Sequence, residues 1–283
     1  MIYIESITFP NAEQEFDFCL GQKRTCYDSF YPFQILSKHQ LSRLDFESVT
    51  ILYGGNGCGK TTALNVIAEK LELKRDSVFN KSNFLPDYLK LCKVEVDWIP
   101  GHSRIITSDD VFDYMLNIRN LNEGLNQKRE ALFEDWVENR YGSFQMKSLE
   151  DYDQLKRKVD ARRKTQSKYV RQEMMDNVRE YSNGESAFQY FAEKIGENGL
   201  FLLDEPENSL SPARQQEFVD FIRDSARFFG CQFIISTHSP FLLALPGAKI
   251  YDMEENPVDV KRWTELKKVR LYYDFFKRHE GEF

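Results

Sequence analysis

The hydrophobic positions of this chain form short runs near both ends and follow helical spacing in between. IYIESITF, EQEFDFCL and VTILY, all within residues 1–53, are rich in β-branched and aromatic residues, and they predict an antiparallel lobe leading into a central strand. The later runs GLFLLDE and CQFIIST are continuously apolar, as in parallel strands covered on both faces. Because PARQQEFVDFIRDSARFF between them has helical spacing, this part of the chain predicts a βαβ unit.

Helical spacing also follows residue 60 and fills the middle of the chain. Four apolar residues of TTALNVIAEKL share one helical face: Leu64, Ile67, Ala68 and Leu71. Residues 109–180 are rich in Lys, Arg, Glu, Asp and Leu and contain no convincing strand, so we expect a helical insertion there. The tail WTELKKVRLYYDFFKR predicts a final amphipathic helix. We expect an α/β fold in one domain, residues 1–283, with the insertion embedded in it.

Composition and charge narrow the class of protein. No apolar run approaches the about 18 residues that a membrane helix needs, so we expect no membrane insertion. The N-terminus MIYIESITFP lacks the features of a secretory signal, which favours the cytoplasm. Five scattered cysteines without a CxxC pair predict reduced thiols. The net charge of −7 argues against a surface that binds nucleic acid throughout, but it allows a local basic patch.

The strongest chemical signal is a glycine-rich loop between a predicted strand and a predicted helix. Residues 54–61, GGNGCGKT, fit G-x-x-x-x-G-K-[ST], in which backbone N–H groups and a helix N-terminus hold phosphates. We expect Lys60 to neutralise the β- and γ-phosphates of ATP, and the Thr61 hydroxyl to ligate Mg²⁺. The predicted nucleotide-binding residues of this loop are Gly54, Gly55, Asn56, Gly57, Cys58, Gly59, Lys60, Thr61 and Thr62. Alone, the pattern arises by chance in roughly one chain in a hundred of this length.

Two predicted strands end on residues that would complete a hydrolytic site. The first ends in Asp204 and Glu205, whose side chains point in different directions because strands have a period of two. We expect Asp204 to hold the Mg²⁺ shell and Glu205 to orient or deprotonate the attacking water. His238 follows the second strand, where it would contact the γ-phosphate and the water. Taken singly, the acids also fit a solvated turn, and the histidine fits a structural role.

The segment Ser182-Asn-Gly-Glu-Ser186 lies 204 − 182 = 22 residues before Asp204 and resembles the signature motif of ABC-type ATPases. In that family the motif opens a helix whose N-terminus binds the γ-phosphate of ATP held by the opposite subunit. The resemblance therefore implies that Ser182 and Gly184 are nucleotide donors. As an isolated string, the segment is equally typical of a helix N-cap followed by a helix-favouring glutamate.

The resemblance covers about residues 1–110 and 180–283. Glu185, in place of the glutamine of transporter subunits, is similar to the structural-maintenance-of-chromosomes and DNA-repair ATPases. The segments GGNGCGKTT, LLDEPENSLSP and ISTHSPFLL resemble stand-alone bacterial ATPases related to the overcoming-lysogenisation-defect and abortive-infection families. The resemblance implies a P-loop NTPase fold of ABC type with an antiparallel β lobe, Mg²⁺-dependent ATP hydrolysis and an ATP-dependent homodimer.

Two positions depart from the ABC pattern. Ser211 stands where the D-loop normally has an aspartate, so a contact across subunits there would be made by a neutral hydroxyl. There is no obvious glutamine for a Q-loop, and the best candidate by position is Ser108-Asp109-Asp110 after RIIT. These three residues equally fit a helix N-cap with acids in its first turn.

Three further features each fit two interpretations. Residues 154–171 carry eight basic side chains and one acid, which fits either a solvated helical arm or a site for nucleic acid or an acidic partner. The basic residues are Lys156, Arg157, Lys158, Arg162, Arg163, Lys164, Lys168 and Arg171. Tyr31 and Phe33 could stack on adenine or belong to the core. Cys58 could be a thiol sensitive to oxidation beside a helix N-terminus, or merely a small tolerated side chain.

Three functions remain in competition. The first is an ATPase dimer that acts on DNA, RNA or an effector protein, with the insertion as transmitter. The second is the nucleotide-binding subunit of a membrane transporter, which predicts a Q-loop glutamine and an LSGGQ-like signature that this chain lacks. The third is a nucleotide-gated binding module with low turnover.

Overall fold

The computed structural model describes residues 1–23, 26–27, 29–143, 152–174 and 183–283. The chain divides into two compact units, one formed by residues 1–112 together with 183–283 and the other by residues 113–182. Within the described residues, no helix combines the length and apolar character needed to cross a membrane.

A three-stranded antiparallel sheet opens the first unit. Its strand order is β2 (Arg43–Asp45), β1 (Ile4–Thr8) and β4 (Lys93–Val96). The first strand was expected from its apolar run, but the expectation of a strand at EQEFDFCL was wrong. That segment is helix α1 (Ala12–Gly21), because Asn11 and Gln14 form a reciprocal capping box that satisfies the first N–H groups of a helix.

A six-stranded sheet carries the rest of the first unit. Its order is β5 (Arg104–Thr107), β6 (Leu200–Asp204), β7 (Gln232–Thr237), β3 (Val49–Tyr53), β8 (Lys249–Asp252) and β9 (Asp259–Val260). The five strands from β5 to β8 are parallel, and β9 is antiparallel to β8. The predicted βαβ unit is confirmed, since β6 and β7 pair in parallel and α8 (Pro212–Phe228) connects them. The α/β fold class is likewise confirmed.

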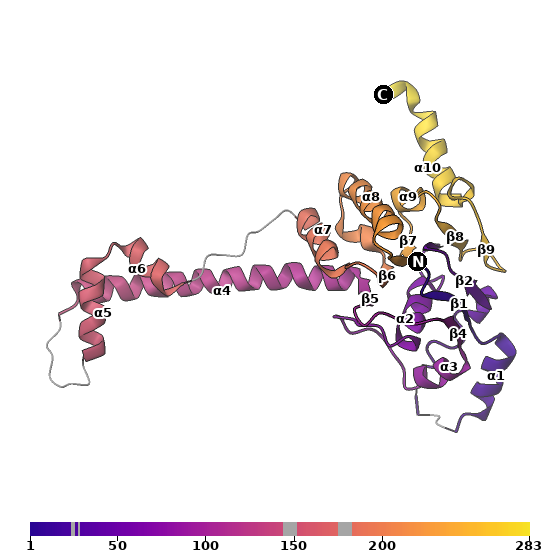
Figure 1. Ribbon diagram of the computed structural model, residues 1–283, viewed down its shortest axis with the longest axis horizontal. Helices are drawn as coiled ribbons and strands as arrows, with labels where there is room; N and C mark the ends of the chain where they lie inside the picture. The colour runs from indigo at the N-terminus through magenta and orange to yellow at the C-terminus, as the bar shows by residue number, and fades with distance from the viewer. Residues whose placement is uncertain (24–25, 28, 144–151, 175–182) are drawn as a thin grey trace. The chain divides into compact units, whose positions relative to one another are not determined.

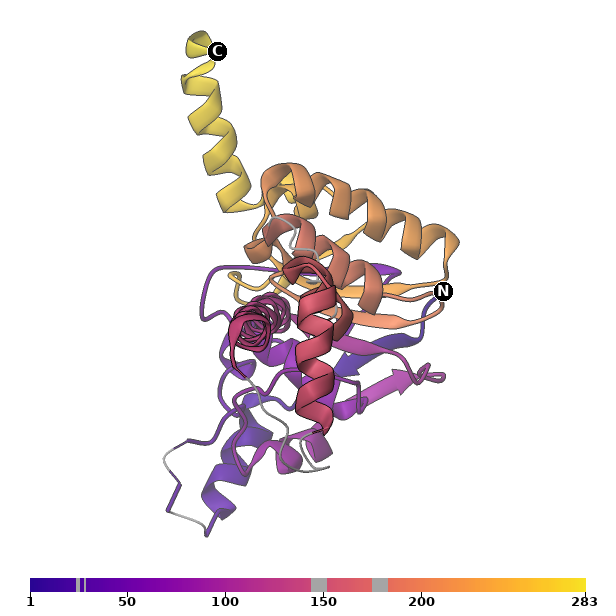
Figure 2. The ribbon, with the colours of Figure 1, turned by 90° about the vertical axis from the view of Figure 1, so that its left-hand side faces the viewer.

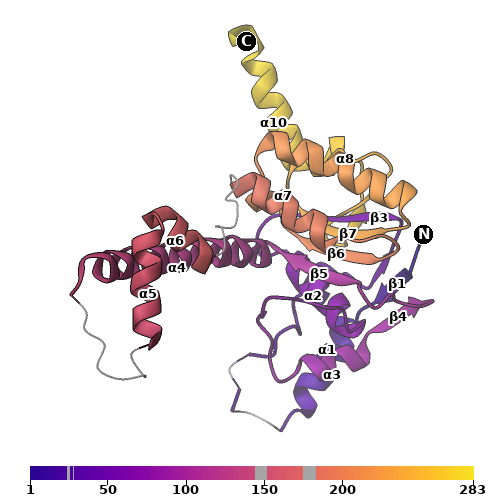
Figure 3. The same ribbon diagram turned by 60° about the vertical axis from the view of Figure 1, so that its left-hand side comes forward.

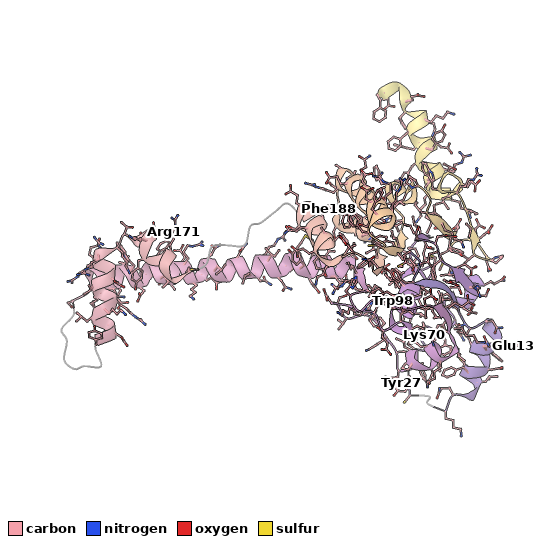
Figure 4. All side chains as sticks on the ribbon, in the orientation of Figure 1. Glu13, Tyr27, Lys70, Trp98, Arg171 and Phe188 are labelled. Carbon is pink, nitrogen blue, oxygen red and sulfur yellow. The ribbon has the colours of Figure 1, made fainter. Side chains whose placement is uncertain are left out.

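Helices cover both faces of this sheet (Figures 1 and 3). α2 (Lys60–Lys70) packs against β6 and β7 on one face, while α7 (Asn183–Lys194) and α8 lie together over the other. The ring of Phe188, labelled on α7 in Figure 4, meets the ring of Phe221 on α8 edge-on at 5.9 Å. α2 is buried on more than the one predicted face, because residues 62–68 are all buried. It therefore serves as a core helix.

Gln232 joins the two sheets. Its fully buried side chain accepts hydrogen bonds from the backbone N–H groups of Tyr3 and Ile4, at 2.8 and 3.0 Å. It also donates to the carbonyl oxygen of Ile4, at 2.9 Å. Since all these partners lie in or beside β1, the β lobe is fixed to the start of β7.

The remaining helices of the first unit are short or terminal. α3 (Leu85–Leu91) contacts α2, and α9 (Pro240–Leu243) follows β7 and contacts α8. The predicted final helix is confirmed as α10 (Lys267–Arg278), preceded by a 3₁₀ turn (Trp263–Glu265). Figure 2 shows α10 extending away from the sheet, and only Val269 in it is buried.

The second unit is helical in its described residues. α4 (Ser108–Tyr141) begins in the first unit and continues into the second, which also holds α5 (Tyr152–Arg163) and α6 (Gln166–Glu173). The Tyr169 hydroxyl donates to the carboxylate of Asp135 at 2.7 Å, and the Trp136 indole donates to the carbonyl of Lys164. These bonds join α4 to the α5–α6 region.

Candidate functional site

The phosphate loop lies between β3 and α2. Gly57 and Gly59 adopt φ angles of +84° and +93°, which side chains with a Cβ rarely tolerate. A Cβ on Gly59 would also lie 3.0 Å from a methyl group of Leu36. The loop therefore needs glycine here for its backbone conformation and for its close approach to the preceding segment.

Lys60 is held inside the loop. Its ammonium donates to the carbonyl oxygens of Gly54 at 2.8 Å and Gly55 at 3.0 Å, and it lies 3.5 Å from Oε1 of Glu205. The lysine side chain is 4% exposed, so its charge sits at the bottom of the loop, where a phosphate would replace solvent.

Thr61 and Asp204 meet across the loop and the end of β6. The Thr61 hydroxyl donates to Oδ1 of Asp204 at 3.1 Å. Burial raises the pKa of Asp204, and the hydrogen bond from Thr61 partly opposes this effect. A buried carboxylate beside a hydroxyl fits Mg²⁺, which takes oxygen ligands from one or two protein side chains and completes its shell with phosphates and water.

Glu205 and His238 lie at the ends of neighbouring parallel strands. Glu205 has a φ of +48°, an unusual conformation for a residue other than glycine, and its Oε2 accepts a hydrogen bond from the amide of Asn208 at 3.1 Å. Nδ1 of His238 lies 4.0 Å from Oε1 of Glu205. The carboxylate thus lies between the lysine of the loop and the imidazole.

Two cavities adjoin these side chains. One of about 390 Å³ is formed by the loop and Glu205, and one of about 950 Å³ includes Tyr31, Asp109 and Asp204 in its wall. Thr61 and Thr62 line both. Volumes of this size are typical of small-ligand sites, and both cavities reach the start of α2.

The segment that resembles an ABC signature is only partly described. Ser182 lies outside the described residues. Gly184 lies in the first turn of α7, and the next residue, Glu185, forms an ion pair with Arg214 of α8 at 3.0 Å. Gly184 lines neither of the two cavities at the phosphate loop. Ser211 is the N-cap of α8, where its hydroxyl accepts a hydrogen bond from the N–H of Arg214.

The residues suggested for a Q-loop divide into two roles. Asp110 is buried, and its Oδ2 accepts hydrogen bonds from the N–H and hydroxyl of Thr107, as expected for the start of a helix. Asp109, in contrast, is exposed and lines the larger cavity together with Asp204. Thr107 is therefore the N-cap and Asp110 its reciprocal partner, whereas Ser108 and Asp109 both line the larger cavity.

Burial decides the roles of Phe33 and Cys58. Phe33 is a core residue that stacks on Phe18 with a centroid distance of 4.4 Å, whereas Tyr31 lines the larger cavity. Burial raises the pKa of the Cys58 thiol, and this outweighs the opposing effect of Lys60. Loss of hydration thus favours the interpretation of Cys58 as a small tolerated side chain over that of a thiol activated by the helix N-terminus.

Sequence reasoning missed two acids at the site. Oε1 of Glu254, after β8, accepts a hydrogen bond from the N–H of Gly55 at 2.7 Å and lies 3.8 Å from the ammonium of Lys268. Glu207 is buried beneath His238 and bonds to the turn that carries it. The position of Glu207 just after Asp204 and Glu205 was the available signal in the sequence, but its contact with His238, 31 residues later, could not be read from spacing.

Comparison with protein families gives one match over residues 87–244, more than half of the chain. The family is described as "AAA domain, putative AbiEii toxin, Type IV TA system". The chain belongs to this AAA-domain family. It is thus an α/β ATPase-type domain, and the matched residues include β6, β7 and the helical second unit. No curated protein sequence matches the chain.

The AAA domain is also similar to several solved structures. The SMC head domain from Thermotoga maritima is 12% identical with a TM-score of 0.40, and the match covers 92% of this chain and 99% of that one. An Smc head domain bound to the C-terminal domain of ScpA, derived from Pyrococcus furiosus, is 13% identical with a TM-score of 0.43 and coverages of 97% and 100%. A nucleotide-free ATP-binding cassette from an ABC transporter is 14% identical with a TM-score of 0.39 and coverages of 82% and 90%. At these low scores, the family match alone identifies the chain.

Proposed function

We propose that this protein binds ATP with Mg²⁺ and hydrolyses it. The single observation that carries the proposal is the convergence of Lys60, Thr61, Asp204, Glu205 and His238 on the phosphate loop, with partner atoms 3.1 to 4.0 Å apart. Each residue type suits one task of phosphoryl transfer, which depends on positioning and on stabilising charge.

In the proposed reaction, Lys60 and the loop N–H groups hold the β- and γ-phosphates. Thr61 and Asp204 would hold Mg²⁺, which supplies charge neutralisation on the phosphate oxygens when bound. Glu205 orients the attacking water and accepts its proton, and His238 lies beside the γ-phosphate and accepts a hydrogen bond from the water. Glu205 must then leave its position near Lys60, since the phosphate takes up that side of the ammonium.

We place the signature segment in the site of a second subunit. Gly184 lines neither cavity of its own phosphate loop, which is consistent with a head-to-tail dimer in which Ser182 and Gly184 complete the opposite site.

The whole chain then acts as one ATPase domain, with an insertion at about residues 109–180. None of the five cysteines forms a disulfide, which is consistent with the reducing cytoplasm.

The proposed work of the domain is on DNA, RNA or an effector protein. Six basic residues of the second unit are exposed: Lys156, Arg157, Arg162, Arg163, Lys168 and Arg171. Lys158 is buried and donates to the carbonyl of Gly142, and Lys164 pairs with Asp160, so these two lysines serve the unit itself. The six exposed basic side chains could bind the phosphate backbone of a nucleic acid or the acidic surface of a protein.

The test is Glu205→Gln. We expect this variant to bind ATP with near-normal affinity, to release phosphate at least about 100-fold more slowly, and to accumulate as an ATP-bound dimer in light scattering. Asn208→Ala, which removes only the amide that contacts Glu205, is the matched control and should remain active. If the unaltered protein does not bind ATP, the proposed ATPase activity is refuted. A variant that binds ATP but stays monomeric would overturn the composite site alone.

A further inference from the structure

Glu207 is a buried acid that the proposed chemistry does not use. It lies in the 3₁₀ turn Pro206–Ser209, directly after Asp204 and Glu205, and it is 6% exposed. Its Oε1 accepts hydrogen bonds from the hydroxyl of Thr237 at 2.6 Å and from the N–H groups of His238 at 2.8 Å and Ser239 at 3.2 Å.

All the bonding of this carboxylate is directed at one turn. Its other oxygen, Oε2, is buried and has no hydrogen-bond partner in the described part of the chain. Three donors on one oxygen compensate the burial of a carboxylate, and they come from the last residue of β7 and the turn that follows it. Glu207 therefore fixes the backbone that carries His238 to the turn that carries Glu205.

The same carboxylate faces the imidazole. Nδ1 of His238 lies 3.4 Å from Oε1 of Glu207 and 4.0 Å from Oε1 of Glu205, so two acids lie within ion-pair distance of this ring nitrogen. An ionised carboxylate can only accept a hydrogen bond, which favours a proton on Nδ1. In the neutral ring Nε2 is then unprotonated, and it is the nitrogen on the opposite side of the ring.

The surrounding bonds make this arrangement rigid. The N–H of Glu205 donates to the carbonyl of Ser236 at 2.9 Å, which ties the end of β6 to β7. The hydroxyl of Ser239 donates to the amide oxygen of Gln215 at 2.6 Å, and the amide nitrogen of Gln215 donates to the carbonyl of Leu210 at 2.9 Å. The turn of Glu207 and the turn of His238 are thus braced from both sides.

We infer that Glu207 is a positioning residue that holds His238 in one orientation and in the tautomer protonated at Nδ1. Nε2 is thereby presented as a hydrogen-bond acceptor on the side of the ring away from the carboxylates. The kinetic consequence rests on the proposed function, because it requires His238 to contact the reacting groups. The tautomer itself does not depend on ATP hydrolysis.

The first experiment measures the tautomer by ¹⁵N NMR of the histidine side chains. The chain has only four histidines, and His238→Ala identifies the signal of interest. We expect His238 to carry its proton on Nδ1, and Glu207→Gln to shift the population toward protonation at Nε2, because an amide can donate as well as accept. A wild-type His238 protonated at Nε2, or a tautomer unchanged in the variant, would overturn the inference.

The second experiment is a double-mutant cycle in steady-state hydrolysis. Glu207→Gln should lower kcat by about 10- to 100-fold and leave KM within about twofold, as for other residues that orient a functional side chain. In the His238→Ala background it should cause no further loss. Glu13→Gln, on the exposed surface of α1 and labelled in Figure 4, is the control for removal of one acid.

The outcomes separate the inference from the proposed function. If the losses from Glu207→Gln and His238→Ala multiply, Glu207 acts independently of His238 and the inference is wrong. If the protein does not hydrolyse ATP, the proposed function is refuted. The NMR measurement of the His238 tautomer then still tests the role of Glu207. Should Glu207→Gln fold poorly, Thr237→Val removes one bond to the carboxylate. The wild-type tautomer itself needs only His238→Ala, which assigns the signal.

Discussion

Replacing Lys60 by methionine tests how the phosphate loop binds its ligand. An ammonium has three donors, and two of them already bond to the carbonyls of Gly54 and Gly55. Only the third, which faces Glu205, is free to turn to a phosphate. ATP therefore gains about one charge-assisted hydrogen bond, worth about 1.5–3 kcal/mol. We expect the dissociation constant of ATP to rise by about 10- to 150-fold.

The substitution also affects the protein without nucleotide. Two backbone carbonyls lose their donor, and we expect the free energy of unfolding to fall by about 1–3 kcal/mol. Lys70→Met is the matched control, because Lys70 lies on the same helix and donates to the carbonyl of Leu89 at 2.8 Å. Its position is labelled in Figure 4. This control removes one backbone bond in place of two, so it should lower stability less than Lys60→Met does, and it should leave ATP affinity unchanged.

Titration with a fluorescent ATP analogue in the presence of Mg²⁺ measures the affinity, and denaturant melts measure the stability. Equal losses of affinity in the two lysine variants would refute the reasoning, since the effect would then come from stability alone. A loss above about 1,000-fold would refute it too, because Lys60 would have to leave its carbonyls and give more than one bond to the phosphates.

Two further predictions concern ionisation. The hydrogen bond from Lys194 lowers the pKa of Asp76, which also accepts from Tyr190, so Asp76→Asn should cost about 1 kcal/mol or less at neutral pH, discounted for exposure. Because the pKa is lowered in the folded state, the difference in stability should shrink as pH falls below about 4, and a difference unchanged at pH 3 would contradict this. Burial keeps the Cys58 thiol protonated, so mass spectrometry should find it alkylated by iodoacetamide at pH 7.5 more slowly than exposed Cys26, and the reverse order would contradict the assignment.

The sequence alone determined the features that depend on local spacing. A phosphate loop needs its glycines and lysine at fixed offsets, so residues 54–61 were recognisable without any tertiary contact. The strands β6 and β7 were also recognisable from the sequence, because strands covered on both faces are continuously apolar. The helical character of the second unit followed from composition over a long stretch.

Local pattern failed where a cap or a long-range contact decided the outcome. EQEFDFCL alternates like a strand, yet Asn11 and Gln14 cap a helix there. Tyr31 and Phe33 are two residues apart and both aromatic, yet Phe33 packs in the core and Tyr31 lines a cavity. Only the tertiary packing distinguishes them. Asp109 and Asp110 are adjacent, but one faces the cavity and the other bonds back to Thr107.

Only the tertiary structure could connect Glu207 with His238. These residues are 31 positions apart, and what joins them is the parallel pairing of β6 with β7, which brings the ends of the two strands to the same edge of the sheet. The order of residues along the chain decides which side chains stand at each strand end. Which of them meet, and through which atoms, depends on the register between the strands and on the turns that follow them.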